Sequence, residues 1–208
     1  IIDRNNNTKA QKLYRLFLFA VMFFFICDAL WGIFYMAKLI LPVYIITVLY
    51  FFAMSISVFL WTRYVIHYLN EKNIFIKILS AFGWAYLIFD GLTLIINFFI
   101  PVRFSFDSQG IYSPAITRYI SLCIQILMFF ITSTYVFVIA AKAGIYEMYR
   151  HITIGAFGIA TTVFLIGQVL FPVWPLYSIG YILGTCLIHT FVHGGEKEEY
   201  RLELENLL

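Results

Sequence analysis

The sequence has few charged residues, since Asp, Glu, Lys and Arg make up only 12% of its 208 residues, whereas soluble domains carry about 25%. Hydrophobic residues account for 62% of the chain, against about 45–50% in soluble domains. These proportions exclude an ordinary soluble globular domain. The net charge of +3 is too small a surplus in so apolar a chain to favour a nucleic-acid partner.

Cysteine and catalytic motifs are also scarce. The three cysteines, Cys27, Cys123 and Cys186, lie inside apolar runs without CxxC or Cys/His spacing, so we interpret them as small core residues and expect no metal site. The sequence contains no nucleophile elbow, P-loop or HExxH motif, and we therefore expect no catalytic residue, no cofactor and no enzyme activity in these residues. No short apolar stretch ends in a small-residue cleavage site, so we expect the first helix to act as its own insertion signal.

Long apolar runs dominate the chain instead. A helix needs about 20 apolar residues to cross a bilayer core of about 30 Å. Six runs bounded by Pro, Gly or charged residues meet this length, at about 13–37, 43–69, 75–100, 119–141, 152–171 and 175–192. The sequence therefore predicts an all-α membrane protein, with an N-terminal segment at 1–12, a six-transmembrane-helix bundle at 13–192 and a C-terminal exit helix at 193–208.

The basic residues are distributed unevenly between the two ends of these predicted spans. Three lie on one side, Lys38, Arg103 and Arg118. Eleven lie on the other: Arg4, Lys9, Lys12, Arg15, Arg63, Lys72, Lys77, Lys142, Arg150, Lys197 and Arg201. Because cytoplasmic loops carry the excess of Lys and Arg, we expect both termini to be cytoplasmic.

The connection between the third and fourth runs has features of a small extracellular β-hairpin. Residues 102–106 alternate apolar and polar side chains, 107–110 supply turn-forming residues, and Ile111 and Tyr112 could return as a partner strand. An irregular surface loop is the alternative interpretation.

Two carboxylates lie within the predicted spans, Asp28 in the first and Asp90 in the third. A charged residue in a bilayer costs about 2.5–3.5 kcal/mol on insertion scales and is a functional-site hypothesis by default. Each lies about 15 residues from the cytoplasmic start of its span, which is roughly 22 Å along a helix. We therefore expect both carboxylates at one depth, in the outer half of the membrane.

Other polar and aromatic residues lie near that depth, and together they predict a polar cup open to the outside. Its candidate ligand-binding residues are Asp28, Trp31, Tyr50, Tyr86, Asp90, Gln125, Gln168, Tyr177 and Tyr181. Aromatic walls with a few convergent polar groups are typical of small-ligand sites. Two facing carboxyls would include at least one protonated group, which favours an amphipathic or weakly polar ligand. Alternatively, these groups hydrogen-bond one another and only stabilise the bundle.

The chain becomes strongly charged after Phe191, with five Glu and two basic residues in the last 13 positions. Tyr200, Leu204 and Leu207 are spaced four and then three residues apart, which begins a heptad pattern. We expect these three residues to relay a signal through a coiled coil. The pattern predicts a homodimer formed through the C-terminal helix, with an effector domain following it.

Three stretches carry a resemblance to a known family: Asp28-Ala29-Leu30-Trp31-Gly32, Trp61-Thr62-Arg63-Tyr64-Val65, and residues 175–191 with the Glu-rich helix after them. They resemble the N-terminal multi-pass membrane sensor region that precedes GGDEF diguanylate cyclase domains, and sometimes histidine kinase domains, in Gram-positive anaerobes. The resemblance implies a sensor in the bacterial plasma membrane. Gly194-Gly195-Glu196 is not a GGDEF signature, because Lys197 and Glu198 follow it.

These observations lead to two functional hypotheses. The first is a signal-input domain that senses a small ligand or the state of the membrane and acts on a cytoplasmic output such as a diguanylate cyclase. Its expected partners are membrane lipid, an unknown small molecule and a second copy of the chain, and not nucleic acid. The second is a small secondary transporter or channel in which Asp28 and Asp90 couple protons to substrate movement.

Overall fold

The computed structural model describes residues 4–71, 73–171 and 174–188. The predicted exit helix, with Tyr200, Leu204 and Leu207, lies outside the described residues. The chain divides into two compact units, Ile1–Met128 and Phe129–Leu208, and the boundary falls within one long helix. We therefore describe each unit by itself, where the sequence predicted one bundle over 13–192.

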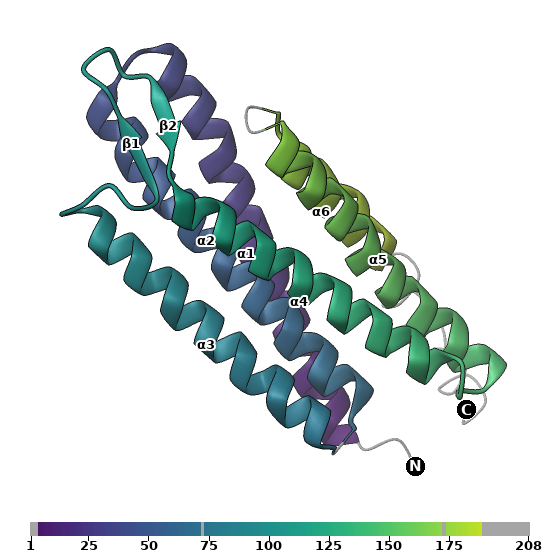
Figure 1. Cartoon of the computed structure of the whole chain (residues 1–208). Helices are drawn as coiled ribbons and strands as arrows, with labels where there is room; N and C mark the ends of the chain where they lie inside the picture. Colours follow the sequence, from purple (N-terminus) through teal and green to yellow (C-terminus); the bar gives the residue numbers. More distant parts are fainter. Residues whose placement is uncertain (1–3, 72, 172–173, 189–208) are drawn as a thin grey trace. The chain divides into compact units, whose positions relative to one another are not determined.

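The described chain is almost entirely helical, as predicted (Figure 1). Its six helices are α1 (Arg4–Met36), α2 (Ile40–Leu69), α3 (Ile74–Asn97), α4 (Ile116–Ala140), α5 (Ile145–Leu170) and α6 (Leu176–Ile188). The first five contain segments long and apolar enough to cross a membrane, and α6 has 13 described residues. Both α1 and α5 begin several residues before the apolar runs, because polar residues such as Lys9, Lys12 and Glu147 continue the helix without interrupting its backbone hydrogen bonds.

Short connections join the helices of the first unit. Asn70 ends α2 in the left-handed conformation, with φ of 51°, which asparagine tolerates better than most residues. The Asn73 side chain then caps α3 by accepting a hydrogen bond from the backbone N–H of Ile76 at 3.0 Å. Within this unit, α1 packs against α2 and α2 packs against α3.

Aromatic side chains fill much of the interior of the first unit. In the first half of α1, the ring centroid of Phe17 lies 5.7 Å from that of Trp61, and the ring centroid of Tyr14 lies 5.4 Å from that of Tyr64. Large apolar side chains on the outward faces of the same helices remain exposed, as Phe19 does. An exposed apolar surface of this extent is typical of helices that contact lipid.

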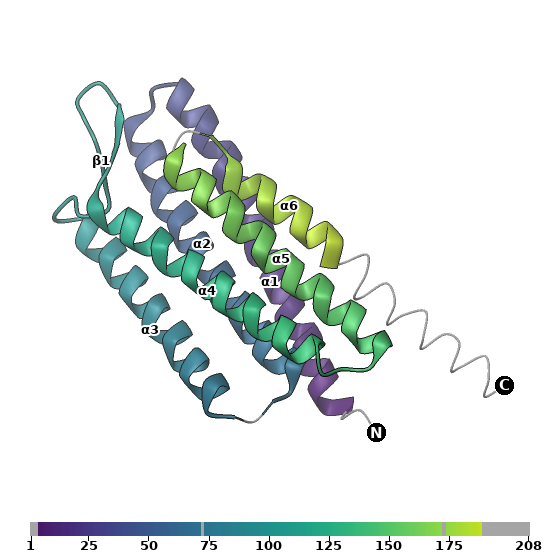
Figure 2. The same ribbon diagram turned by 45° about the vertical axis from the view of Figure 1, so that its right-hand side comes forward.

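The connection between α3 and α4 contains a two-stranded antiparallel hairpin, in which β1 (Phe104–Phe106) pairs with β2 (Tyr112–Pro114). Asp107 stabilises the turn, since its Oδ1 accepts hydrogen bonds from the backbone N–H groups of Gln109 and Ile111, both at 2.8 Å. Gly110 provides the positive φ of 78° that the turn requires. The hairpin lies at the end of the first unit where α1 runs into α2 (Figure 2).

In the second unit, α5 packs closely against α6. Glycines allow this approach, because a Cβ at Gly180 would lie 2.8 Å from Phe164 Cβ and one at Gly184 would overlap the Phe157 ring. The Phe157 ring stacks on Tyr181 with centroids 6.4 Å apart. Small residues that admit a neighbouring aromatic side chain therefore determine the separation of these two helices.

Candidate functional site

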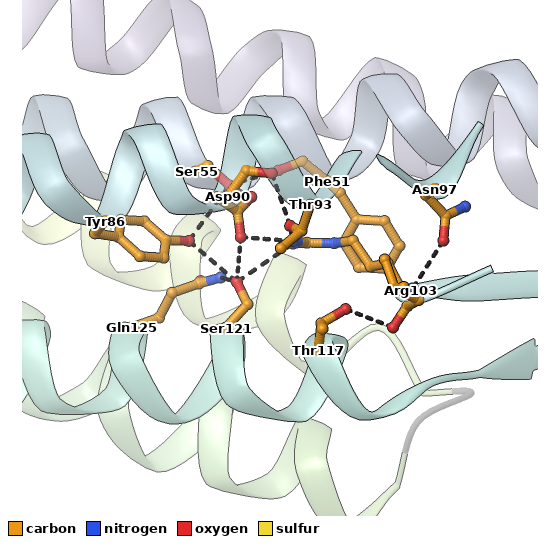
Figure 3. Close-up of polar contacts among 11 residues, drawn as sticks. Phe51, Ser55, Tyr86, Asp90, Thr93, Asn97, Arg103, Thr117, Ser121 and Gln125 are labelled. Atoms are coloured by element: carbon orange, nitrogen blue, oxygen red, sulfur yellow. Dashed lines mark hydrogen bonds and ion pairs between the residues drawn. The ribbon is translucent and has the colours of Figure 1, made fainter. Parts of the chain in front are cut away.

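The most conspicuous polar feature of the first unit is a buried ion pair between Asp90 and Arg103 (Figure 3). Asp90 lies in the third quarter of α3 and is 0% exposed, while Arg103 directly precedes β1 and is 1% exposed. Arg103 Nη1 donates to Asp90 Oδ1 at 2.6 Å. Since an unpaired buried charge is strongly destabilising, the burial of each of these two side chains depends on the presence of the other.

Two serines complete the coordination of the Asp90 carboxylate. Ser121 Oγ, from α4, donates to Oδ1 at 2.6 Å, and Ser55 Oγ, from α2, donates to Oδ2. The carboxylate of α3 therefore accepts hydrogen bonds from two other helices and from the segment before the hairpin. Hydrogen bonds to an ionised group are roughly twice as strong as those between neutral groups, so this carboxylate ties four segments together.

The Arg103 guanidinium has further partners of its own. Nη1 also donates to Thr93 Oγ1 at 3.0 Å, and Nη2 donates to Ser121 Oγ at 3.3 Å. Its Cζ lies 4.5 Å from the centroid of the Phe51 ring, within the range of a cation–π contact. The guanidinium is thus held between a carboxylate, two hydroxyls and an aromatic face.

Tyr86 and Gln125 extend this network away from the hairpin. The Tyr86 hydroxyl lies 3.3 Å from Ser55 Oγ and 3.4 Å from Ser121 Oγ, and Gln125 Nε2 donates to Ser121 Oγ at 3.4 Å. We call the network the Asp90 cluster and define it as Ser55, Tyr86, Asp90, Thr93, Arg103, Ser121 and Gln125. The structure thus brings together three of the residues predicted from the sequence.

The backbone around Arg103 is fixed from both sides. At the end of α3, Asn97 Oδ1 accepts from the N–H groups of Arg103 at 2.7 Å and Phe104 at 3.2 Å, and its Nδ2 donates to Phe104 O at 3.2 Å. At the start of α4, Thr117 Oγ1 donates to Val102 O at 2.6 Å. The Asn97 amide pairs with the chain as another peptide group would, so the entry to the hairpin is anchored to both helices.

The predicted residues of the first two helices lie in a different environment. Asp28 is half-buried on α1. Trp31 and Tyr50 pack against an apolar cluster of Cys27, Val43 and Ile46 between α1 and α2. Trp31 Nε1 also donates to Thr47 Oγ1 at 3.0 Å, and its ring meets the edge of Tyr112 in the hairpin at 6.1 Å. Both aromatic side chains therefore contribute to the packing of α1 against α2, and Trp31 also contacts the hairpin.

Three of the predicted ligand-binding residues, Gln168, Tyr177 and Tyr181, lie in the second unit and are connected by hydrogen bonds through Tyr177. Gln168 Oε1 accepts a hydrogen bond from the backbone N–H of Tyr177 at 3.2 Å, which caps the first turn of α6. The hydroxyls of Tyr177 and Tyr181 lie 2.6 Å apart. This arrangement connects the end of α5 to the start of α6.

Sequence reasoning missed the residues that complete the Asp90 cluster. The sequence analysis places Arg103 in the hairpin strand and among the outer basic residues but not beside Asp90, although intramembrane carboxylates commonly pair with cations and Arg103 follows Asp90 by 13 residues. The group that faces the Asp90 carboxylate is therefore a guanidinium, whereas the sequence analysis considered a second carboxyl group there. Ser55 and Ser121 carried no signal, because serines within helices also hydrogen-bond their own backbone, as Ser55 does with Phe51 O at 2.9 Å.

Comparison with protein-family models, with curated proteins and with solved structures finds no match for this chain.

Proposed function

We propose that the chain is a membrane-embedded signal-input domain, which senses a small ligand or the state of the membrane and relays it to a cytoplasmic output such as a diguanylate cyclase. The observation that supports this proposal most is the Asp90–Arg103 ion pair. It links the segment that leads into the hairpin with α3, and through Ser55 and Ser121 with α2 and α4. The proposal assigns no catalytic step to these residues.

The proposed topology has six transmembrane helices in a bacterial plasma membrane, with both termini cytoplasmic and the hairpin extracellular. Five long apolar helices support it, and the sixth span of the proposal is the run predicted at 175–192, of which the structure describes α6. Arg103 and Arg118 are buried, so Lys38 is the exposed residue among the three basic residues assigned to the outer side. The orientation rests on the excess of Lys and Arg on the side assigned to the cytoplasm, eleven against three.

The Asp90 cluster would act as the two-state element of such a sensor. A buried ion pair in an apolar surrounding is either formed or broken, because a partly separated pair leaves two charges without solvent. An event that displaces the hairpin would change the balance between these states, provided that the ligand binds one of them better. Shifts of about 1–2 Å in the connected helices would then reach the C-terminal helices of a homodimer.

An intramembrane carboxylate also favours the alternative function, a small transporter or channel. Proton coupling at Asp90 would have to break the hydrogen bonds that its carboxylate accepts from Arg103, Ser121 and Ser55. Substrate flux into proteoliposomes that disappears in Asp90→Asn would favour transport over sensing.

The signalling proposal is tested by attaching a diguanylate cyclase after Leu208 and measuring cyclic di-GMP in cells. We expect Asp90→Asn and Arg103→Gln to shift the output in the same direction, because each breaks the same ion pair. Lys38→Gln is the matched control, since it removes one exposed positive charge near the outer end of α1. Output that stays at the wild-type level in both variants, at equal protein amounts in the membrane, would overturn the proposal.

A further inference from the structure

Arg118 is the second buried arginine of the first unit, and its environment differs from that of Arg103. It lies in the first turn of α4 and is 6% exposed. Its Nη1 is completely enclosed and has no hydrogen-bond partner among the described residues. Arginine is rarely buried unless it is paired, and a buried donor without an acceptor carries the full cost of desolvation.

Two aromatic rings flank this guanidinium. Its Cζ lies 5.9 Å from the ring centroid of Tyr112 on β2 and 5.7 Å from that of Tyr119 on α4. These distances are within the range of cation–π attraction. Ring faces attract the positive charge but provide no lone pair along the edge of the guanidinium, so Nη1 still lacks an oxygen acceptor among the described residues.

The position of Arg118 in α4 adds to the positive potential. The amino end of a helix carries a partial positive charge from its free N–H groups, and it favours anions and disfavours cations. Arg118 nevertheless lies within the first turn of a 25-residue helix. The amino end of α4 and the Arg118 guanidinium are both positive, and together they favour a negatively charged group beside them.

Tyr112 can contribute a neutral hydrogen-bond donor at this place. Burial raises the pKa of its phenol above the ordinary value, and the lowering effects of the Arg118 and Arg103 charges are smaller. The hydroxyl therefore remains protonated at neutral pH, and the charged residues that influence it most are both cations.

We propose that Arg118, flanked by Tyr112 and Tyr119, binds a phosphate oxyanion where the hairpin joins α4. The inference rests on the proposed sensor function in that it names the chemistry of the input ligand. Planar guanidinium groups bind phosphates through two parallel hydrogen bonds. This ligand class differs from the weakly polar ligand expected from the sequence, because that expectation came from two carboxylates and did not include a buried arginine.

The hairpin would connect this site to the Asp90 cluster. β2 carries Tyr112 and runs directly into α4, while β1 follows Arg103 (Figure 1). Phe106 pairs with Tyr112 in the hairpin register. An oxyanion that draws Tyr112 towards Arg118 would therefore act on the strand that leads back to Arg103.

The oxyanion can come from a phospholipid headgroup or from solution, and one experiment distinguishes these sources. The full chain is purified in dodecyl maltoside, which contains neither phosphate nor carboxylate. Its unfolding temperature is measured against inorganic phosphate and, separately, against dioctanoyl phosphatidate, with sodium chloride at matched ionic strength as reference. Tryptophan fluorescence is a suitable readout, because the Trp31 ring contacts Tyr112.

We expect either ligand that binds to raise the unfolding temperature of the wild type, with an apparent affinity at least about tenfold weaker in Arg118→Gln. Arg118→Lys should retain part of the effect, because it keeps the charge and loses the paired geometry. Lys38→Gln, which removes an exposed cation, should respond as the wild type does. Stabilisation by both ligands indicates a site for free oxyanions, and stabilisation by phosphatidate alone indicates a lipid headgroup.

The proposal is overturned if neither ligand stabilises the wild type, or if Arg118→Gln responds as strongly as the wild type. If Arg118→Gln fails to fold, the ligand affinities of Arg118→Lys and the wild type are compared instead. Equal affinities in these two proteins would contradict binding at Arg118. Binding is measured here without any signalling output. Failure of the sensor proposal would therefore appear as intact binding with an unchanged cyclic di-GMP level.

Discussion

At the residue scale, the Asp90 cluster shows how an apolar bundle accommodates two charges. Asp90 and Arg103 pair at 2.6 Å, and hydroxyls from three helices occupy the remaining positions around them. Such a pair is weak evidence for stability, because desolvation offsets much of the attraction. Its effect is to specify which segments meet, since a displaced hairpin leaves both charges unpaired.

A double-mutant cycle tests this interdependence. We expect Arg103→Gln to lower the free energy of unfolding by about 3–5 kcal/mol, because it leaves the Asp90 carboxylate buried without a cation. The double variant with Asp90→Asn should lose much less than the sum of the two single losses. The measurement is reversible unfolding in mixed micelles, and additive losses would show that the two residues contribute independently.

At the element scale, close packing of α5 and α6 depends on glycines that receive aromatic side chains. A Cβ at Gly184 would overlap the Phe157 ring, and Phe157 itself is completely buried. An overpacked interior forces side chains out of their preferred rotamers. The separation of these helices is therefore sensitive to a single methyl group.

The substitution Gly184→Ala is expected to destabilise the protein by about 1–3 kcal/mol, the usual cost of overpacking. Gly32→Ala in α1 is the matched control, because a Cβ there meets no atom within 4 Å. The control should be neutral or stabilise by up to about 1 kcal/mol, since alanine is the better helix former. Thermal unfolding of both variants in the same detergent compares them, and an equal loss in the two would contradict this packing explanation.

At the scale of the whole molecule, the apolar outer faces of the helices and the distribution of basic residues support a multi-pass membrane protein. Five helices are long and apolar enough to cross. Arg63, near the end of α2, donates to Ser80 Oγ at 2.9 Å, and Lys9 and Lys12 lie near the start of α1. In the proposed topology these residues face the cytoplasm.

Cysteine labelling of intact cells tests that topology. A cysteine at Ser108, in the hairpin turn, should react with a membrane-impermeant maleimide, while one at Asn70, between α2 and α3, should react only after the cells are permeabilised. The chain with its three native cysteines gives the background. Only Cys27 is the core residue that the sequence predicted, whereas Cys123 and Cys186 are exposed and should react slowly where their surfaces face lipid in the proposed topology. Labelling of both positions from the same side would exclude the proposed orientation.

Much of the helical architecture could be predicted from the sequence, because apolar length is a local property of the chain. The runs at 43–69 and 75–100 correspond to α2 (Ile40–Leu69) and α3 (Ile74–Asn97) within a few residues. The largest differences are at the starts of α1 and α5, where polar residues continue a helix that hydropathy alone does not detect. The prediction of an all-helical protein with long apolar helices is confirmed.

The candidate site was predictable only in part. Tyr86, Asp90 and Gln125 share a cluster because helical spacing and equal depth can be calculated from residue numbers. The prediction did not include Arg103, since its contribution depends on a chain reversal after Asn97 that places the Arg103 backbone beside Asn97 and its guanidinium against Asp90. Trp31 and Tyr50 lie at a similar depth but pack against the apolar cluster between α1 and α2.

The sequence by itself determined that the chain is helical, how long its helices are and which carboxylates lie within apolar spans, because these properties depend on neighbouring residues. Only the tertiary structure decided which cation pairs with Asp90 and that Nη1 of Arg118 is buried without an acceptor among the described residues. Arg103 and Arg118 are similar in sequence context, because each is followed directly by an aromatic residue, Phe104 and Tyr119. In the folded chain, Arg103 before β1 reaches a carboxylate of α3, while Arg118 after β2 lies near two tyrosine rings, and these contacts depend on residues distant in sequence.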